Sequence, residues 1–192
     1  MPPIKKIDRE YIITAALDIL NNEGIEFINA RKLASKLNCS VQPIFYNFKS
    51  MVDLKSEVLA RIYEIYKKYM NAGKSHKKPY KGMGLAYIKF ARDYPNYFKC
   101  IFMGETNLSP ISFITNDDAG NDVIKSGMEA TGLSYEEQKE FHLAVWIFTH
   151  GLASLVATKT VILNDEDIDF LLESTVKKMI IGKKILDNEK CN

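Results

Sequence analysis

The chain has 192 residues, of which 46% are hydrophobic and 26% charged, and its formal net charge is +2. These values are ordinary for a soluble globular protein of one or two small domains with a sizeable core. A net charge this small does not by itself indicate a nucleic-acid partner, so the distribution of basic residues matters more than their sum.

The cysteines, the N-terminal residues and the lengths of the apolar runs argue against several other classes of protein. Cys39, Cys100 and Cys191 are odd in number and widely spaced, which fits a reducing cytoplasm and neither a disulfide framework nor a zinc site. Met1 to Glu10 is short and polar and therefore does not resemble a signal peptide. No apolar run approaches the roughly 20 residues of a membrane span, so we expect no membrane contact.

The first predicted helix follows a basic start. Lys5, Lys6 and Arg9 form either a solvated tail or an arm that meets DNA phosphates. Apolar residues from Ile12 to Leu20 repeat at helical spacing, which predicts a helix over 8–22 that Gly24 ends. This helix would complete a three-helix head.

Residues 29–50 predict two short helices joined by a tight turn. Asn29 can cap the first helix, and Leu33, Ala34 and Leu37 give it one apolar face. Asn38 stands where a left-handed residue is needed, and Ser40 can cap a second helix that starts at Val41. A helix-turn-helix of this kind places its second helix in the major groove of DNA, although the same geometry also occurs as plain structure.

The second helix of this motif carries the functional argument. Ile44, Phe45 and Phe48 are expected to turn inward, which leaves the other side chains outward. Gln42 can bond adenine N6 and N7 together, Val41 or Pro43 can touch a thymine methyl group, and Tyr46 and Lys49 can hold phosphates.

The run S-V-Q-P-I-F-Y-N-F-K-S-M-V-D-L resembles the recognition-helix signature of the tetracycline-repressor (TetR/AcrR) family, over about Asp8 to Leu59. The usual glycine of the turn is Asn38, the usual Gly-Thr at the base-reading positions is Gln42-Pro43, and the common tyrosine is Phe45, so Tyr46 would supply the phosphate contact. The residues predicted to contact DNA are Asn29, Arg31, Ser40, Val41, Gln42, Pro43, Tyr46, Asn47 and Lys49.

The remaining elements are read as helices of a second region. We expect helices over 50–71, 81–92, 95–102, 118–131, 134–158 and 165–182, a short helix near 111–114, and a solvated loop over 72–80. Residues 141–157 are apolar almost all round, and Gly151, Ala153, Ser154 and Ala157 would let another helix come close. The last two helices therefore predict a homodimer that forms a four-helix interface.

Two further stretches, W-I-F-T-H-G-L-A-S-L and M-G-L-A-Y-I-K-F-A-R-D-Y-P-N-Y-F-K, resemble a subgroup of the same family with a Trp-x-x-x-His-Gly motif, over about Lys81 to Leu172. The resemblance implies a cavity in this region for a mostly apolar small-molecule effector. Its candidate lining residues are Tyr66, Tyr87, Phe102, Trp146 and His150, although core packing would explain most of the aromatic residues equally well.

Catalysis has little support in the sequence. His142, Trp146 and His150 share one helical face, but no carboxylate or thiol accompanies them at metal-ligand spacing, so we expect no metal and no cofactor. Phosphate-binding loops, serine nucleophile elbows and zinc-hydrolase motifs do not occur in the chain.

These observations predict an all-α protein, with a helix-turn-helix DNA-binding domain over 1–50 and a helical effector-binding and dimerisation domain over 51–192. The expected function is that of a cytoplasmic homodimeric transcription regulator, a repressor that a small molecule releases from a pseudo-palindromic operator. The alternatives are a helical adaptor that retains the head only as structure, and a small helical enzyme.

Overall fold

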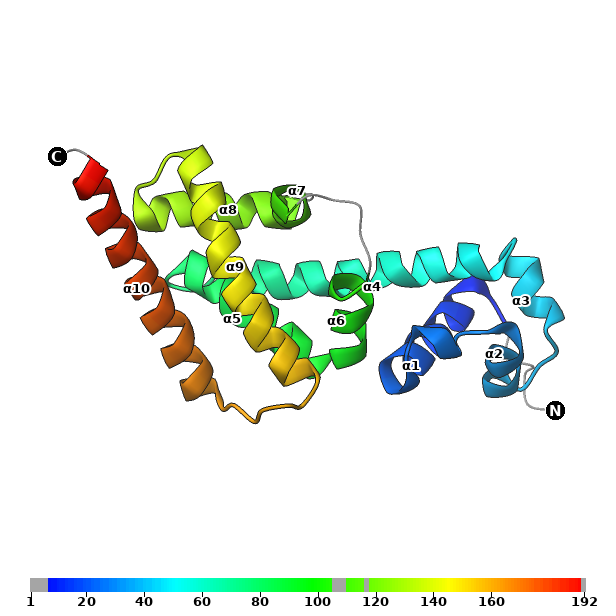
Figure 1. Ribbon diagram of the computed structural model, residues 1–192. Helices are drawn as coiled ribbons and strands as arrows, with labels where there is room; N and C mark the ends of the chain where they lie inside the picture. The colour runs from blue at the N-terminus through cyan, green and yellow to red at the C-terminus, as the bar shows by residue number, and fades with distance from the viewer. Residues whose placement is uncertain (1–6, 105–109, 116–117, 191–192) are drawn as a thin grey trace. The chain divides into compact units, whose positions relative to one another are not determined.

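The computed structural model describes residues 7–104, 110–115 and 118–190. All regular structure in these residues is helical, which confirms the predicted all-α class (Figure 1). The helices are α1 (Arg9–Glu23), a short 3₁₀ turn η1 (Ile25–Phe27), α2 (Ala30–Leu37), α3 (Gln42–Asn47), α4 (Met51–Lys74), α5 (Pro79–Asp93), α6 (Pro95–Phe102), α7 (Pro110–Thr115), α8 (Asp118–Thr131), α9 (Tyr135–Ala157) and α10 (Asp165–Lys190).

The helices form two compact units. One consists of residues up to Tyr66 together with Tyr94–Gly104, and the other of Lys67–Asp93 together with the residues after Gly104. Helix α4 is continuous from the first unit into the second, because its last turns, after Tyr66, belong to the second unit. We call the unit that contains the residues up to Tyr66 the head unit, and the unit that contains Lys67–Asp93 the body unit.

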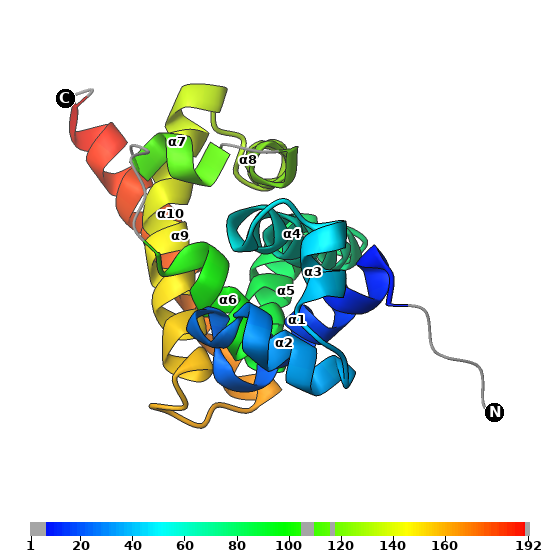
Figure 2. The same cartoon turned by 90° about the vertical axis from the view of Figure 1, so that its right-hand side faces the viewer.

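The head unit is built on the apolar face of α1. Ile12, Ala16 and Leu20 are fully buried on this helix, and α2, α3 and α6 all pack against it (Figure 2). Asp8 caps α1 by accepting a hydrogen bond from the backbone N–H of Tyr11, and Gly24 ends the helix at a φ of 117° that suits glycine. This core holds α3 in a fixed orientation.

The body unit is organised around α9. This helix packs on α5 and α8, while α10 contacts α5 and α9 (Figure 1). The predicted capping box is confirmed, because the Ser134 side chain accepts from the Glu137 N–H and the Glu137 carboxylate accepts from the Ser134 N–H.

Helix α9 is also long and apolar enough, by length and composition, to cross a membrane. The expectation that no such run exists was therefore wrong. The core helix of a soluble protein passes the same test, and the contacts of α9 with α5 and α8 account for two of its apolar faces.

Candidate nucleic-acid interface and effector cavities

The turn between α2 and α3 has the predicted geometry. The Asn29 side chain caps α2 by accepting from the Lys32 N–H at 3.0 Å, and Leu33 and Leu37 are buried. Asn38 adopts the left-handed conformation, with φ 52° and ψ 48°, and its N–H donates back to the end of α2. An asparagine tolerates this region better than other non-glycine residues, so the turn is formed without strain.

The start of α3 differs from the prediction. The helix begins at Gln42 after Val41, and Ser40 is exposed and makes no side-chain cap. Val41 is already in the right-handed helical conformation, with φ −72° and ψ −16°, so the chain enters the helix without an extended capping residue. Pro43 lies in the first turn, where a missing N–H removes no helical hydrogen bond.

The outward side of α3 carries most of the predicted DNA contacts. Tyr46 is 83% exposed, and Val41, Gln42 and Lys49 are also exposed, while Pro43 is half-buried. Ile44 and Phe48 are fully buried beneath them and fix the helix on the head unit. Arg31 is exposed on α2. The exposed surface therefore combines an amide, a phenol, an ammonium group and apolar groups.

Two residues of α3 do not lie as predicted. Phe45 was expected to turn inward but is 49% exposed, because a six-residue helix has only one inward face and Ile44 and Phe48 occupy it. Phe45 is thus an aromatic group of the outward surface that the sequence reasoning missed. Asn47 is half-buried, and its amide donates to the carbonyl oxygens of Pro43 at 2.8 Å and of Ile7 at 3.4 Å.

Arg9 holds the end of α3 in place. Its guanidinium donates to the Glu57 carboxylate on α4 and to the carbonyl oxygen of Asn47, and it lies over the Phe48 ring at 4.2 Å. Arg9 therefore belongs to α1 and is not part of a solvated tail or a free arm. Lys5 and Lys6, which shared that prediction, lie outside the described residues.

The five candidate effector residues fall into two separate groups. Tyr66 and Phe102 form an edge-to-face pair in the head unit, with ring centroids 5.1 Å apart. In the body unit, the Tyr87 hydroxyl lies 2.9 Å from Nδ1 of His150, and the His150 ring stacks on Trp146 at 4.8 Å. The structure thus joins three of the five residues between α5 and α9.

A second tyrosine–histidine pair lies between the same helices. The Tyr80 hydroxyl is 2.9 Å from Nδ1 of His142, which is buried, and this burial lowers the pKa of His142 to about 4. Desolvation also lowers the pKa of His150. His142 and His150 therefore contact tyrosines of α5, and among the described residues no three histidine, cysteine or acidic side chains come together as a metal site would require.

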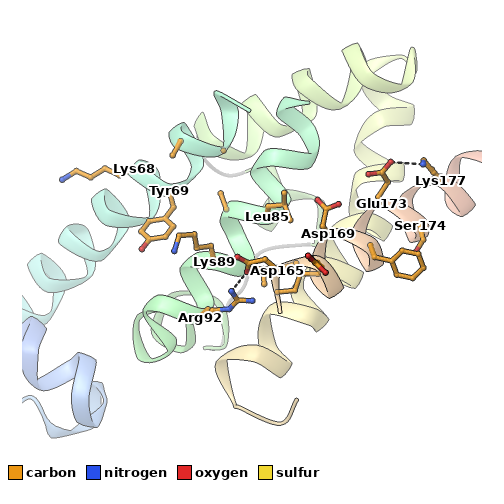
Figure 3. A pocket seen from close by; sticks show the side chains of 17 residues that line it. Lys68, Tyr69, Leu85, Lys89, Arg92, Asp165, Asp169, Glu173, Ser174 and Lys177 are labelled. Atoms are coloured by element: carbon orange, nitrogen blue, oxygen red, sulfur yellow. Dashed lines mark hydrogen bonds and ion pairs between the residues drawn. The ribbon is translucent and has the colours of Figure 1, made fainter. Parts of the chain in front are cut away.

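A large groove lies between the end of α4, α5 and the first half of α10, with a volume of about 1160 Å³ (Figure 3). Its apolar strip includes Ala72, Leu85 and Phe170. Four cationic side chains (Lys68, Lys89, Arg92 and Lys177) and four acidic side chains (Asp165, Glu166, Asp169 and Glu173) line it, so its charges balance. Arg92 pairs with Asp165 and Lys177 with Glu173 inside it.

A smaller cavity of about 540 Å³ lies between the start of α5 and helices α8, α9 and α10. Val145, Leu172, Val176 and Ile180 provide apolar walls, and four lysines stand around its rim: Lys77, Lys78, Lys81 and Lys177. We call this the lysine-rimmed cavity. Neither this cavity nor the groove is lined by any of the five candidate effector residues.

The last two helices expose several apolar side chains. Ala144, Ile147, Gly151 and Leu155 are all exposed on α9 at helical spacing, and a Cβ added at Gly151 would meet open space. Ala153 and Ala157, predicted together with Gly151 to let another helix come close, are buried in the protomer's own core. On α10, Phe170, Ile181, Ile185 and Leu186 are each more than half exposed.

Comparison with known proteins agrees with this architecture. The family model described as "Tetracyclin repressor-like, C-terminal domain" matches residues 80–179, which is more than half of the chain. An uncharacterized HTH-type transcriptional regulator of Mycobacterium tuberculosis is 22% identical over 180 residues, covering 92% of this chain and 82% of the relative.

Two other similarities extend this result. The tetracycline repressor protein class D of Escherichia coli is 43% identical over 61 residues, which covers 29% of this chain and 28% of the repressor. The crystal structure of a TetR-like transcriptional regulator from Rhodococcus sp. RHA1 has the same fold, with a TM-score of 0.69 at 13% identity, and covers 93% of this chain and 99% of that protein. The chain therefore belongs to the tetracycline-repressor-like family of DNA-binding transcriptional regulators.

Proposed function

We propose that the protein is a ligand-responsive repressor that binds a pseudo-palindromic operator as a homodimer and leaves it when a small molecule binds the body unit. The observation that carries this proposal is the outward face of α3, where Tyr46 is 83% exposed while Ile44 and Phe48 are buried beneath it. Such a face suits the major groove, because each exposed group has a chemical counterpart on DNA.

The roles of the side chains follow from their chemistry. Gln42 would bond adenine N6 and N7, and Val41 and Pro43 would touch thymine methyl groups. Tyr46 and Lys49 would hold phosphates, with Ser40 and Arg31 beside them. Asn29 supports the interface by capping α2, and Asn47 supports it by donating to the carbonyl oxygen of Ile7. These hydrogen bonds leave less of either side chain for contacts with DNA.

Pairing of two chains would aim the two recognition helices. The exposed apolar residues of α9 and α10 support a four-helix interface in which Gly151 permits close approach of the partner helix. Two-fold symmetry would then place the half-sites about one helical turn of DNA apart, or a multiple of it.

The effector would act through α4, which is continuous from the head unit into the body unit. A ligand that favours one arrangement of the body by about 1–3 kcal/mol would change operator affinity measurably.

The name of the relative that is 43% identical over 61 residues, a tetracycline repressor, supports both repression and a small-molecule effector. A division of labour between residues 1–50 and 51–192, membership of the Trp-x-x-x-His-Gly subgroup and a cytoplasmic location belong to the same proposal.

A helical adaptor with a structural helix-turn-helix remains the alternative. The two are separated by a fluorescence anisotropy titration of the full chain against the DNA that flanks its own gene. We expect saturable binding that the Tyr46→Ala substitution weakens at least tenfold, while Asn22→Ala, an exposed change on α1, has no effect. Equal affinity for flanking and unrelated DNA, or an unchanged affinity of Tyr46→Ala, would favour the adaptor.

A further inference from the structure

The lysine-rimmed cavity has the size and the walls of a small-molecule site. Its volume of about 540 Å³ is within the range of ligand pockets, and Val145, Leu172, Val176 and Ile180 bring aliphatic groups to it from α9 and α10. The interior would therefore accept an apolar tail.

The rim of the cavity carries an excess of positive charge. Lys177 and Lys81 are partly neutralised, because both donate to the Glu173 carboxylate, at 2.8 and 2.5 Å, and these hydrogen bonds lower the pKa of Glu173 to about 2. Lys81 also pairs with Asp169 at 2.7 Å, and Glu129 is the second acidic residue of the lining, so four lysines face two carboxylates in the cavity wall. Lys78 is 3.7 Å from Glu173, and Lys77 pairs with no acidic group within the described part of the chain. Among the described residues, the segment before α5 thus leaves Lys77 without an ion pair and Lys78 weakly paired.

The first turn of α5 adds to this positive potential. Helix α5 has 15 residues and begins at Pro79, and Tyr80 and Lys81, which follow it, line the cavity. First-turn amides have no acceptor inside their own helix, and the helix dipole favours an anion there.

A hydroxyl in the cavity wall provides an independent indication of a ligand. Ser126 on α8 is only 9% exposed and lines the cavity, yet its hydroxyl makes no hydrogen bond to any residue that the structure describes. Buried polar groups normally have a partner, so a hydroxyl left open toward a cavity fits a polar atom of a bound molecule. Thr149, by contrast, is satisfied by the Val145 carbonyl oxygen at 2.8 Å.

We propose that the lysine-rimmed cavity binds an organic anion with an apolar tail, its head at Lys77, Lys78 and the start of α5, and its tail along α10. The groove of Figure 3 lacks this selectivity because its four cations face four acidic groups. The proposal deepens the effector-binding part of the proposed function, and its regulatory meaning rests on that function. Since Leu172, Val176 and Ile180 of α10 form one wall, the ligand would act on a helix of the proposed dimer interface.

The test is isothermal titration calorimetry of the full chain with decanoate, decanol and decylammonium, each below its aggregation concentration. Decanoate should bind once per chain, about tenfold more tightly than decanol, and decylammonium should bind most weakly. The advantage of decanoate should shrink as ionic strength rises. Decyl phosphate, used as a second anion, distinguishes a carboxylate site from a phosphate site, and tighter binding of either anion supports the proposal.

Two sets of variants locate the site. Lys77→Gln combined with Lys78→Gln should remove most of the preference for decanoate over decanol, whereas Lys68→Gln, in the groove of Figure 3, should not. A Cβ at Gly84 would meet only the Leu172 Cδ1 atom at 3.7 Å, so Gly84→Leu should fill the cavity and abolish binding, while Gly84→Ala keeps it. Thermal unfolding of each variant checks that the fold is intact.

Absence of decanoate binding, equal binding of decanol, or an equal loss in Lys68→Gln would overturn the proposal. Operator binding is measured separately in the absence of any ligand. Failure to bind DNA would contradict the proposed function but would not affect the cavity assignment. Failure to bind decanoate would contradict the cavity assignment but would not affect the DNA-binding function.

Discussion

Lys49 stands just beyond α3 and is exposed, and an ammonium group is suited to a phosphate contact. We therefore predict that Lys49→Ala weakens binding to all DNA sequences alike. The slope of log K against the logarithm of the salt concentration should become shallower by about one unit. Titrations at several salt concentrations measure this, with Lys68→Ala as the control. An unchanged slope would remove Lys49 from the interface.

His142 makes the stability of the protein depend on pH. In the folded chain the pKa of His142 is about 4, below the ordinary value of 6.5, because burial disfavours the charged ring. Below pH 6.5 the unfolded chain therefore binds a proton that the folded chain does not. The free energy of unfolding should fall by up to about 3 kcal/mol as the pH is lowered from 6.5 to 4.

Denaturant unfolding at pH 7, 6 and 5 tests this prediction. His142→Gln should flatten the decline, and His76→Gln, a change at an exposed histidine, should leave it as in the wild type. If both variants decline as steeply as the wild type, another group is responsible.

Single residues could be predicted where their role is local. Asn38 was predicted to be left-handed because the turn chemistry of asparagine depends on its own backbone. Asn47 could not be predicted, since its amide reaches the carbonyl oxygen of Ile7, 40 residues earlier. The exposure of Phe45 likewise depended on which residues occupy the inward face of α3, because Ile44 and Phe48 fill that face.

At the scale of elements, the sequence failed to predict how closely α4 and α5 approach each other. The sequence predicts a solvated loop over 72–80 that includes Gly73, but α4 continues to Lys74 and α5 begins at Pro79. A Cβ at Gly73 would lie 2.6 Å from the Gly82 carbonyl oxygen, so this glycine permits a close helix crossing and does not end the helix. Helix α10 similarly runs through Gly182, beyond its predicted end, to Lys190.

These two glycines give a matched pair of predictions. Gly73→Ala should lower the free energy of unfolding by about 1–3 kcal/mol, because its methyl group meets backbone that cannot move aside cheaply. Gly182→Ala, where a Cβ meets open space, should raise it by up to about 1 kcal/mol through helix propensity. Thermal or denaturant unfolding measures both, and a Gly73→Ala protein as stable as the wild type would show that the crossing is looser than described.

At the scale of the whole molecule, the all-α class could be predicted from the helical spacing of apolar residues, whereas the cavities could not be predicted from the sequence. The rim of the lysine-rimmed cavity joins Lys81 to Glu173, which are 92 residues apart, and no local pattern encodes that meeting. For the same reason, the five candidate effector residues divided between the head and body units.

Dimerisation is the main whole-molecule prediction. Ile147 is 59% exposed in the protomer, so Ile147→Glu should leave the monomer folded but bury a charge in the proposed interface. Multi-angle light scattering should find a dimer for the wild type and a monomer for this variant. Met103→Glu, which charges an exposed residue at the end of α6, should remain dimeric. A monomeric wild type at working concentration would contradict the proposed assembly.

The central claim is that the outward face of α3 reads bases, and the most direct measurement is the affinity of wild type and Gln42→Ala for an operator and its single-base-pair variants. We predict that Gln42→Ala costs about 1–3 kcal/mol on the operator and makes one position indifferent to the base present, with discrimination at the other positions kept. An equal loss of affinity on every sequence would contradict the claim.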